Sequence, residues 1–260
     1  MVSIKICIVA ISIIAVLSFK LVQGQLQLFD GIDAVEGEFP YMVSLRLGFN
    51  EHDCGGSIIG SRWILTAGHC SDIETVKYGT IVVDQYKYDP NRTIAVKNFI
   101  THPDIQFIRV NSSYGYILND IAVIELAEDI PYGPTAKPVK LAERNAEVPY
   151  NQTGLLSGWG FTTITGDLSP ILQKINITTY ERDYCINNSM ELYQDDGTNI
   201  CGGSDKEGRG VCYKDSGSPY VIDGVQYGVL AWMTIPCGSR VVGFSSVSYY
   251  RDWIYSVTGI

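Results

Sequence analysis

The sequence predicts an all-β protein, and three observations support this. In residues 43–47, apolar Val43, Leu45 and Leu47 alternate with Ser and Arg, which is the period of a strand. Residues 220–229 form two short apolar runs around Asp223-Gly224, a pattern typical of a β-hairpin. Turn residues recur through the chain, which favours a barrel.

The only helix that the sequence predicts lies at the C-terminal end, at about residues 249–258. Tyr250, Trp253, Ile254 and Val257 follow the i, i+3, i+4, i+7 spacing of one helical face. The final segment therefore departs from the strand pattern of the rest of the chain.

Residues 1–24 predict a secretory signal. Lys5 supplies a positive charge, residues 6–19 carry none, and small enough residues for cleavage precede Gln25. A membrane anchor is the alternative, but it needs about 20 apolar residues and Lys20 ends the run early. We therefore expect a secreted, extracellular protein in which residues 25–260 form one domain or two closely packed halves.

The charge balance bears on the partners of this chain. The formal net charge is -9, and loss of the two lysines in residues 1–24 makes the remainder more acidic still. An acidic surface argues against nucleic acid or an anionic membrane as a partner, since both are negatively charged.

Six cysteines remain once Cys7 leaves with the signal. They are Cys54, Cys70, Cys185, Cys201, Cys212 and Cys237. An even number in a secreted chain indicates disulfide bonds, although the spacing alone leaves the pairing open. A zinc site is the rival interpretation, but no C-x-x-C pair occurs.

Five N-x-S/T motifs are candidate glycosylation sites. Their asparagines are Asn91, Asn111, Asn151, Asn176 and Asn187. In a secreted chain each predicts a surface position. We expect only some of them to be modified.

Three short motifs contain the residue types of nucleophilic catalysis. Ser216 lies in C-Y-K-D-S-G-S-P at 212–219, His69 in T-A-G-H-C at 66–70, and Asp120 in N-D-I-A-V at 119–123. A serine needs a base to take its proton and donors to stabilise the oxyanion that forms. Each residue alone has an ordinary explanation, such as a turn or a packed histidine, and we expect that explanation for His52 and His102.

Together with four further segments, at 37–45, 54–57, 157–160 and 231–232, these motifs resemble the chymotrypsin-like serine peptidases in the same order along the chain. The resemblance covers about residues 28–254. It implies a peptidase domain at 28–260 after a short pro-segment at 25–27. The fold would be two packed six-stranded antiparallel barrels, at about 28–137 and 147–248, with a C-terminal helix and the site between the barrels.

The resemblance also implies the role of each site residue. His69 would take the proton from Ser216 and return it to the leaving amine, while Asp120 orients the imidazole. The backbone N–H groups of Lys214 and Ser216 would form the oxyanion hole. The implied disulfides are Cys54–Cys70, Cys185–Cys201 and Cys212–Cys237. No metal or other cofactor is implied. The partners would be protein or peptide substrates and protein inhibitors, and the protein itself would be a monomer.

Substrate choice would depend on the pocket wall. Gly210 stands where trypsin-like members carry an aspartate, so cleavage after Lys or Arg is not expected. Val211 and Gly243 would keep the pocket apolar, and Met233 would narrow its mouth unless it simply packs. We expect an apolar P1 residue, either aromatic or small, with Met233 favouring small to medium.

Lys214 is the main departure from the family pattern, which has Gly at this position. A Cβ here adds strain or flips the peptide if the loop needs a conformation suited to Gly. Loss of one oxyanion donor costs about 3 to 4 kcal/mol. The Lys214 side chain would also project near the leaving-group side and exclude tight-binding inhibitors. Ser218 and Ala231 are milder departures.

Activation is the second departure. In the family, a new amino terminus pairs with the aspartate before the serine, which implies a pair between Leu28 and Asp215. No basic residue lies between the signal and Leu28, so trypsin-type activation is not expected. Asp30 would add a charge near Asp215, which is unfavourable without a partner.

Two functions remain. The complete set of His69, Asp120 and Ser216 favours a secreted serine endopeptidase. The oxyanion and activation departures favour a non-catalytic homologue that acts as a binding or decoy module. An unrelated structural glycoprotein would leave the ordered motifs unexplained.

Overall fold

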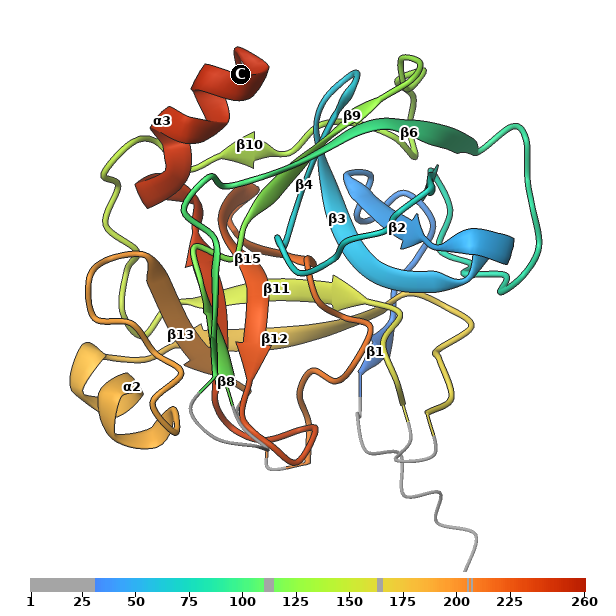
Figure 1. The fold of residues 1–260 in the computed structure, drawn as a ribbon. Coiled ribbons are helices and arrows are strands. Elements are labelled where there is room, and N and C mark those ends of the chain that lie inside the picture. Colours follow the sequence, from blue (N-terminus) through green and yellow to red (C-terminus); the bar gives the residue numbers. More distant parts are fainter. Residues whose placement is uncertain (1–30, 110–114, 163–165, 205, 207) are drawn as a thin grey trace, which may run out of the picture.

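Two six-stranded antiparallel barrels make up the fold (Figure 1). The computed structural model describes residues 31–109, 115–162, 166–204, 206 and 208–260. The first barrel closes in the order β2-β3-β4-β9-β6-β5. Its strands are β2 (Met42–Arg46), β3 (His52–Gly60), β4 (Trp63–Thr66), β5 (Thr75–Tyr78), β6 (Thr93–Thr101) and β9 (Ala122–Leu126).

The second barrel runs in the order β12-β11-β14-β15-β16-β13 and closes through the pairing of β12 with β13. Its strands are β11 (Thr153–Gly158), β12 (Gln173–Thr179), β13 (Asn199–Gly203), β14 (Pro219–Ile222), β15 (Val225–Met233) and β16 (Val242–Ser246). The predicted all-β class with two six-stranded barrels is therefore confirmed.

Four short strands lie outside the barrel walls. β1 (Ile32–Asp33) pairs with β12, so the first described segment of the chain joins the second barrel. β10 (Lys140–Leu141) runs parallel to β15, and β7 (Gln106–Arg109) pairs with β8 (Gly115–Leu118) in a separate ribbon.

The hairpin predicted around Asp223-Gly224 is present between β14 and β15. Both turn residues have positive φ, 49° at Asp223 and 78° at Gly224. A two-residue turn with positive φ at both positions matches the twist of the paired strands, which is why Asp-Gly was a reliable indicator.

The alternation at residues 43–47 predicted a strand correctly but not its environment. Every residue of β2 is buried, including Ser44 and Arg46, and Leu47 lies beyond the strand. Burial of these polar side chains is tolerated because each is hydrogen-bonded: Ser44 bonds to His52, and Arg46 donates to backbone carbonyls.

The expectation of one helix was wrong. The C-terminal helix α3 (Val247–Thr258) is present and packs Val247, Tyr250 and Ile254 into the core of the first barrel. A second helix, α2 (Arg182–Asn188), has seven residues, of which only Cys185 is buried. It contains too few apolar residues for helical periodicity to reveal it, and the Cys185–Cys201 disulfide ties it to β13 instead.

The disulfides are the three pairs that the resemblance implied, Cys54–Cys70, Cys185–Cys201 and Cys212–Cys237. The proposed signal at 1–24, the pro-segment at 25–27, Leu28 and Asn111 lie outside the described residues. The other four glycosylation asparagines are exposed. In the described part of the chain, no helix has the length and apolar character needed to cross a membrane.

A buried guanidinium organises one end of the first barrel. Arg46 is 1% exposed and donates from Nη1 to the carbonyl oxygens of Asn50, at 2.7 Å, and Asp84, at 3.3 Å. Its Nη2 donates to the carbonyl of Val83. Burial, and then the nearby Arg46 charge, lower the pKa of Lys77. One side chain therefore binds a carbonyl of the loop between β2 and β3 and two carbonyls of the loop between β5 and β6.

We predict that Arg46→Met lowers the free energy of unfolding by about 2 to 4 kcal/mol, because it removes the donor to the buried Val83 carbonyl and two further hydrogen bonds, to Asn50 and Asp84. Denaturant unfolding with the disulfides intact measures this. Arg62→Met removes an arginine that pairs with Asp129 at the surface, and it should have a much smaller effect. Equal losses in the two variants would contradict the structural role of Arg46.

Candidate active site

A cleft of about 540 Å³ collects residues from both barrels. His69 lies in the turn after β4 and Asp120 lies two residues before the start of β9, while Ser216 lies in the turn before β14. The three residues are more than 50 positions apart in sequence at each step. The pairing of β4 with β9 brings His69 and Asp120 together within the first barrel, and the packing of the two barrels adds Ser216. The structure therefore brings the candidate triad to one cavity.

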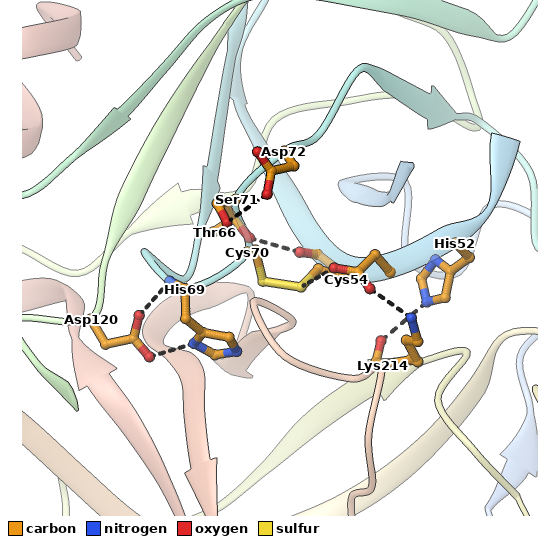
Figure 2. The surroundings of a disulfide bond; sticks show 11 residues. His52, Cys54, Thr66, His69, Cys70, Ser71, Asp72, Asp120 and Lys214 are labelled. Atoms are coloured by element: carbon orange, nitrogen blue, oxygen red, sulfur yellow. Dashed lines mark hydrogen bonds and ion pairs between the residues drawn. A yellow bond between two sulfur atoms is a disulfide. The ribbon is translucent and has the colours of Figure 1, made fainter. Parts of the chain in front are cut away.

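His69 and Asp120 are joined by two hydrogen bonds (Figure 2). Asp120 Oδ2 lies 2.6 Å from His69 Nδ1, and Asp120 Oδ1 accepts the backbone N–H of His69 at 2.9 Å. Asp120 is 3% exposed, and Ser245 donates to its backbone carbonyl at 2.6 Å. The Cys54–Cys70 disulfide fastens the neighbouring residue of His69 to β3. The imidazole is therefore held with Nε2 directed away from Asp120.

The protonation of His69 follows from these contacts. Burial by itself lowers the pKa of the imidazole, but the charge of Asp120 and its hydrogen bond outweigh burial and raise the pKa above its ordinary value. A histidine in this state can accept a proton near neutral pH and retain it long enough to transfer it onward.

Ser216 is held by a compact turn. The N–H of Asp215 donates to Cys212 at 3.2 Å, the N–H of Ser218 donates to Asp215 at 3.1 Å, and Gly55 donates to the Ser216 carbonyl at 2.8 Å. No hydrogen bond joins Ser216 Oγ to His69 in the described structure. Catalytic hydrogen bonds are often long before substrate binds, so the absence of this bond is compatible with proton transfer from Ser216 to His69.

Lys214 adopts the conformation that glycine would favour, with φ of 74°. Such a conformation costs a residue with a side chain about 1 to 3 kcal/mol. Neither the N–H of Lys214 nor that of Ser216 donates to another group among the described residues. Both donors are therefore available to a ligand.

His52 was expected to be an ordinary surface or core residue, and it is completely buried. It also contacts the serine turn. Ser44 Oγ lies 2.8 Å from its Nδ1, and its Nε2 lies 3.1 Å from the carbonyl oxygen of Lys214. Burial lowers the pKa of His52 to about 3, so the ring is neutral and its Nε2–H donates to the carbonyl. No sequence motif predicted the contact between His52 and Lys214.

The position of Asp215 explains why the 157–160 segment has glycine at positions 158 and 160. Its carboxylate accepts the N–H groups of Gly160, at 2.7 Å, and Cys212, at 3.1 Å. A Cβ at Gly158 would lie 2.1 Å from Asp215 Oδ1, and one at Gly160 would lie 2.3 Å from Cγ. Burial raises the pKa of Asp215 to about 6, against the opposing effect of both hydrogen bonds. Within the described residues, no cation pairs with this carboxylate.

The predicted pocket residues do not all line one cavity. Met233 lines the cleft, Gly210 lines a second, smaller cavity beside Asp215, and Val211 lines both. Gly243 pairs with Trp232 across β15 and β16, and a Cβ there would lie 1.8 Å from the indole ring.

The residue opposite Met233 across these strands is Val242, which the sequence analysis did not single out. It also did not name several residues that line the cleft, because they come from loops without a distinctive motif. They include Tyr116, Ile117, Met190, Leu192, Tyr213 and Ile235.

One group of metal-ligand residue types occurs among the described residues. The ligand atoms of Cys54, His69 and Cys70 lie within 4.8 Å of one another. A metal requires thiolates, and both sulfurs are bonded to each other in the disulfide. This group therefore holds the histidine turn together by a covalent bond.

Comparison with known proteins places the chain in a family. A family model described as Trypsin matches residues 28–254, so the chain belongs to the trypsin family of serine proteases. It is 31% identical over 245 residues to a trypsin of Phaedon cochleariae, covering 90% of each protein. It is 28% identical over 231 residues to Trypsin 5G1 of Aedes aegypti, covering 88% of this chain and 84% of that protein.

Two solved structures have the same fold. Neuropsin, a serine protease expressed in the limbic system of mouse brain, superposes with a TM-score of 0.76 at 27% identity and covers 88% of this chain and 99% of its own. Human heparin binding protein superposes with a TM-score of 0.75 at 24% identity, covering 89% and 96%. The second likeness concerns the fold alone.

The buried carboxylate of Asp215 predicts a pH dependence of stability. Because its folded pKa is raised to about 6, the folded chain binds a proton between about pH 4 and pH 6 that the unfolded chain does not. This group therefore stabilises the full-length chain at low pH and loses that contribution as the pH rises through 6.

We predict that Asp215→Asn becomes more stable relative to the full-length parent chain between pH 4 and pH 7, by at most about 3 kcal/mol. The measurement is the difference in unfolding free energy between the two chains across this range, since groups common to both cancel. A difference that stays constant with pH would contradict the raised pKa.

Proposed function

We propose that this protein is a secreted serine endopeptidase that hydrolyses peptide bonds through an acyl-enzyme. The observation that carries the proposal is the Asp120–His69 hydrogen bond in the same cleft as Ser216, whose turn also carries two backbone N–H groups without a partner among the described residues. Its partners are protein or peptide substrates and protein inhibitors, and it acts as a monomer. Proteases of this family act on protein substrates, which supports the substrate class.

The proposed reaction uses each group once in each half. Ser216 Oγ attacks the peptide carbonyl while His69 Nε2 takes the hydroxyl proton, and the carbonyl oxygen becomes an oxyanion. The N–H groups of Lys214 and Ser216 stabilise that oxyanion. Collapse breaks the C–N bond as His69 gives the proton to the leaving amine. Water then attacks the acyl-enzyme by the same steps and releases the second product and Ser216.

Asp120 orients the imidazole and stabilises its protonated form, since it accepts hydrogen bonds from both the ring and the backbone of His69. Ala231 offers no hydroxyl to this carboxylate, but burial and the two bonds already fix its position. The milder departure at this position is therefore compatible with activity.

Activation at Leu28 is a further part of the proposal. A small cavity lined by Gly31, Gly160 and Asp215 supports it, because an amine placed there would meet the unpaired carboxylate. The peptidase that frees Leu28 would not need a basic residue before the cut. In a chain that begins at Leu28, Asp215 would be held ionised, and the sign of the stability effect of Asp215→Asn would reverse.

A non-catalytic homologue is the second candidate function. The observation that favours it is Lys214, which occupies a conformation natural to glycine and depends on other contacts to remain there. If those contacts fail, one donor turns away and about 3 to 4 kcal/mol of transition-state stabilisation is lost. The fold would then serve as a binding or decoy module.

We further propose an apolar P1 preference for small to medium residues. Val211 and Met233 line the cleft, and Val242 lies opposite Met233 in the adjacent strand. No aspartate stands at Gly210 to pair with a basic side chain. Val211 and Met233 would limit the depth of the pocket, and the buried Val242 would support Met233 from the adjacent strand.

We predict that Met233→Gly shifts preference from small toward aromatic P1 residues, with an increase of about ten- to a hundredfold in the ratio of kcat/KM for Phe over Ala substrates. Matched peptides that differ only at P1 measure this ratio. Ile235→Gly is a suitable control, since Ile235 lines the cleft without a cross-strand partner at the pocket. An unchanged ratio would show that Met233 simply packs.

The direct test of the proposed function is labelling of the processed protein by a fluorophosphonate. We expect stoichiometric labelling on Ser216, on a chain that mass spectrometry shows to begin at Leu28, and none in Ser216→Ala. The same experiment decides between the two candidate functions. A folded, disulfide-bonded chain that takes no label would refute the peptidase and favour the binding module.

A further inference from the structure

The oxyanion turn depends on a residue whose side chain opposes its own backbone conformation. Lys214 has φ of 74°, where a Cβ is unfavourable and glycine is not. A rotation of this peptide would turn away one of the two N–H groups of the proposed oxyanion hole. Some other contact must therefore maintain the conformation.

One short segment contacts Lys214 at both its backbone and its side chain (Figure 2). His52 donates to the Lys214 carbonyl at 3.1 Å. The ammonium group lies 2.6 Å from Asp53 Oδ1 and 3.7 Å from Glu51 Oε1. Residues 51, 52 and 53 are consecutive, so three successive side chains hold this one residue.

The Lys214–Asp53 pair is better placed than an ordinary surface ion pair. The two side chains are only 23% and 25% exposed, so water screens their attraction less. Asp53 is also rigidly placed, because it lies in β3 next to Cys54, whose disulfide partner Cys70 follows His69. Asp53, which contacts the oxyanion turn, and the Cys54–Cys70 disulfide, which fastens the turn of His69, are therefore adjacent in the same strand.

We propose that Asp53 is a positioning residue of this site, which holds the Lys214 peptide in its left-handed conformation through the ion pair. The ion pair offsets the conformational cost of positive φ at Lys214, a cost that glycine would not have. Asp53 touches neither substrate nor reacting atoms in this mechanism and acts only through Lys214. The inference rests on the proposed function and deepens it, since it names what keeps the oxyanion hole formed.

The test compares Asp53→Ala in two backgrounds, the parent chain and Lys214→Gly. Removing the anchor should slow acylation of Ser216 by a fluorophosphonate, and lower kcat on a peptide substrate, by about tenfold with KM nearly unchanged. In the Lys214→Gly background, whatever its own rate, the same substitution should change acylation by less than twofold. High salt should slow the parent chain more than the Lys214→Gly chain.

Asp129→Ala is the matched control, because Asp129 pairs with Arg62 at the surface and neither residue lines the cleft, so it should leave acylation unchanged. Equal losses from Asp53→Ala in both backgrounds, or no loss in either, would overturn the proposal. A general structural role for Asp53 would produce the first of these results.

Failure of the proposed function gives a different result. If the processed parent chain takes no label, the peptidase is refuted, and the anchor is judged by amide hydrogen exchange over residues 212–217. Faster exchange in Asp53→Ala than in Asp129→Ala would support the anchor. Equal exchange in these two variants would overturn it.

Discussion

The site is built around the buried carboxylate of Asp215. It accepts N–H groups from its own turn and from Gly160, so it joins the serine turn to the loop after β11. The carboxylate lies so close to Gly158 and Gly160 that no side chain fits at either position. The placement of Ser216 and of the two free N–H groups therefore depends on how this one charge is accommodated.

The first barrel contributes its half of the site through a similarly small region. Residues 51–54 contact Lys214 and, through the Cys54–Cys70 disulfide, connect to the turn that bears His69. Asp120 then fixes the imidazole from the start of β9. The segment at 51–54 contacts the serine turn, and a shared apolar core that includes Val221 and Val229 holds the two barrels together behind the cleft.

Much of the fold could be predicted because its signals are local. The Asp223-Gly224 turn requires positive φ at both residues, which only certain residues tolerate, and α3 repeats its apolar residues over several turns. Helix α2 could not be found in this way, because its seven residues bury only Cys185. Val242 was missed for a related reason, since the irregular pairing of β15 with β16 decides which residue faces Met233.

By itself, the sequence determined the order of the His, Asp and Ser motifs and the chemical types available for the site. It also determined the family pattern that links the cysteines in pairs. Only the tertiary structure decided that Asp53 and Glu51 meet Lys214, that His52 supports the same turn, and that Gly243 lies behind Trp232. These contacts join residues distant in sequence, and their geometry depends on strand register and barrel packing, which no local pattern encodes.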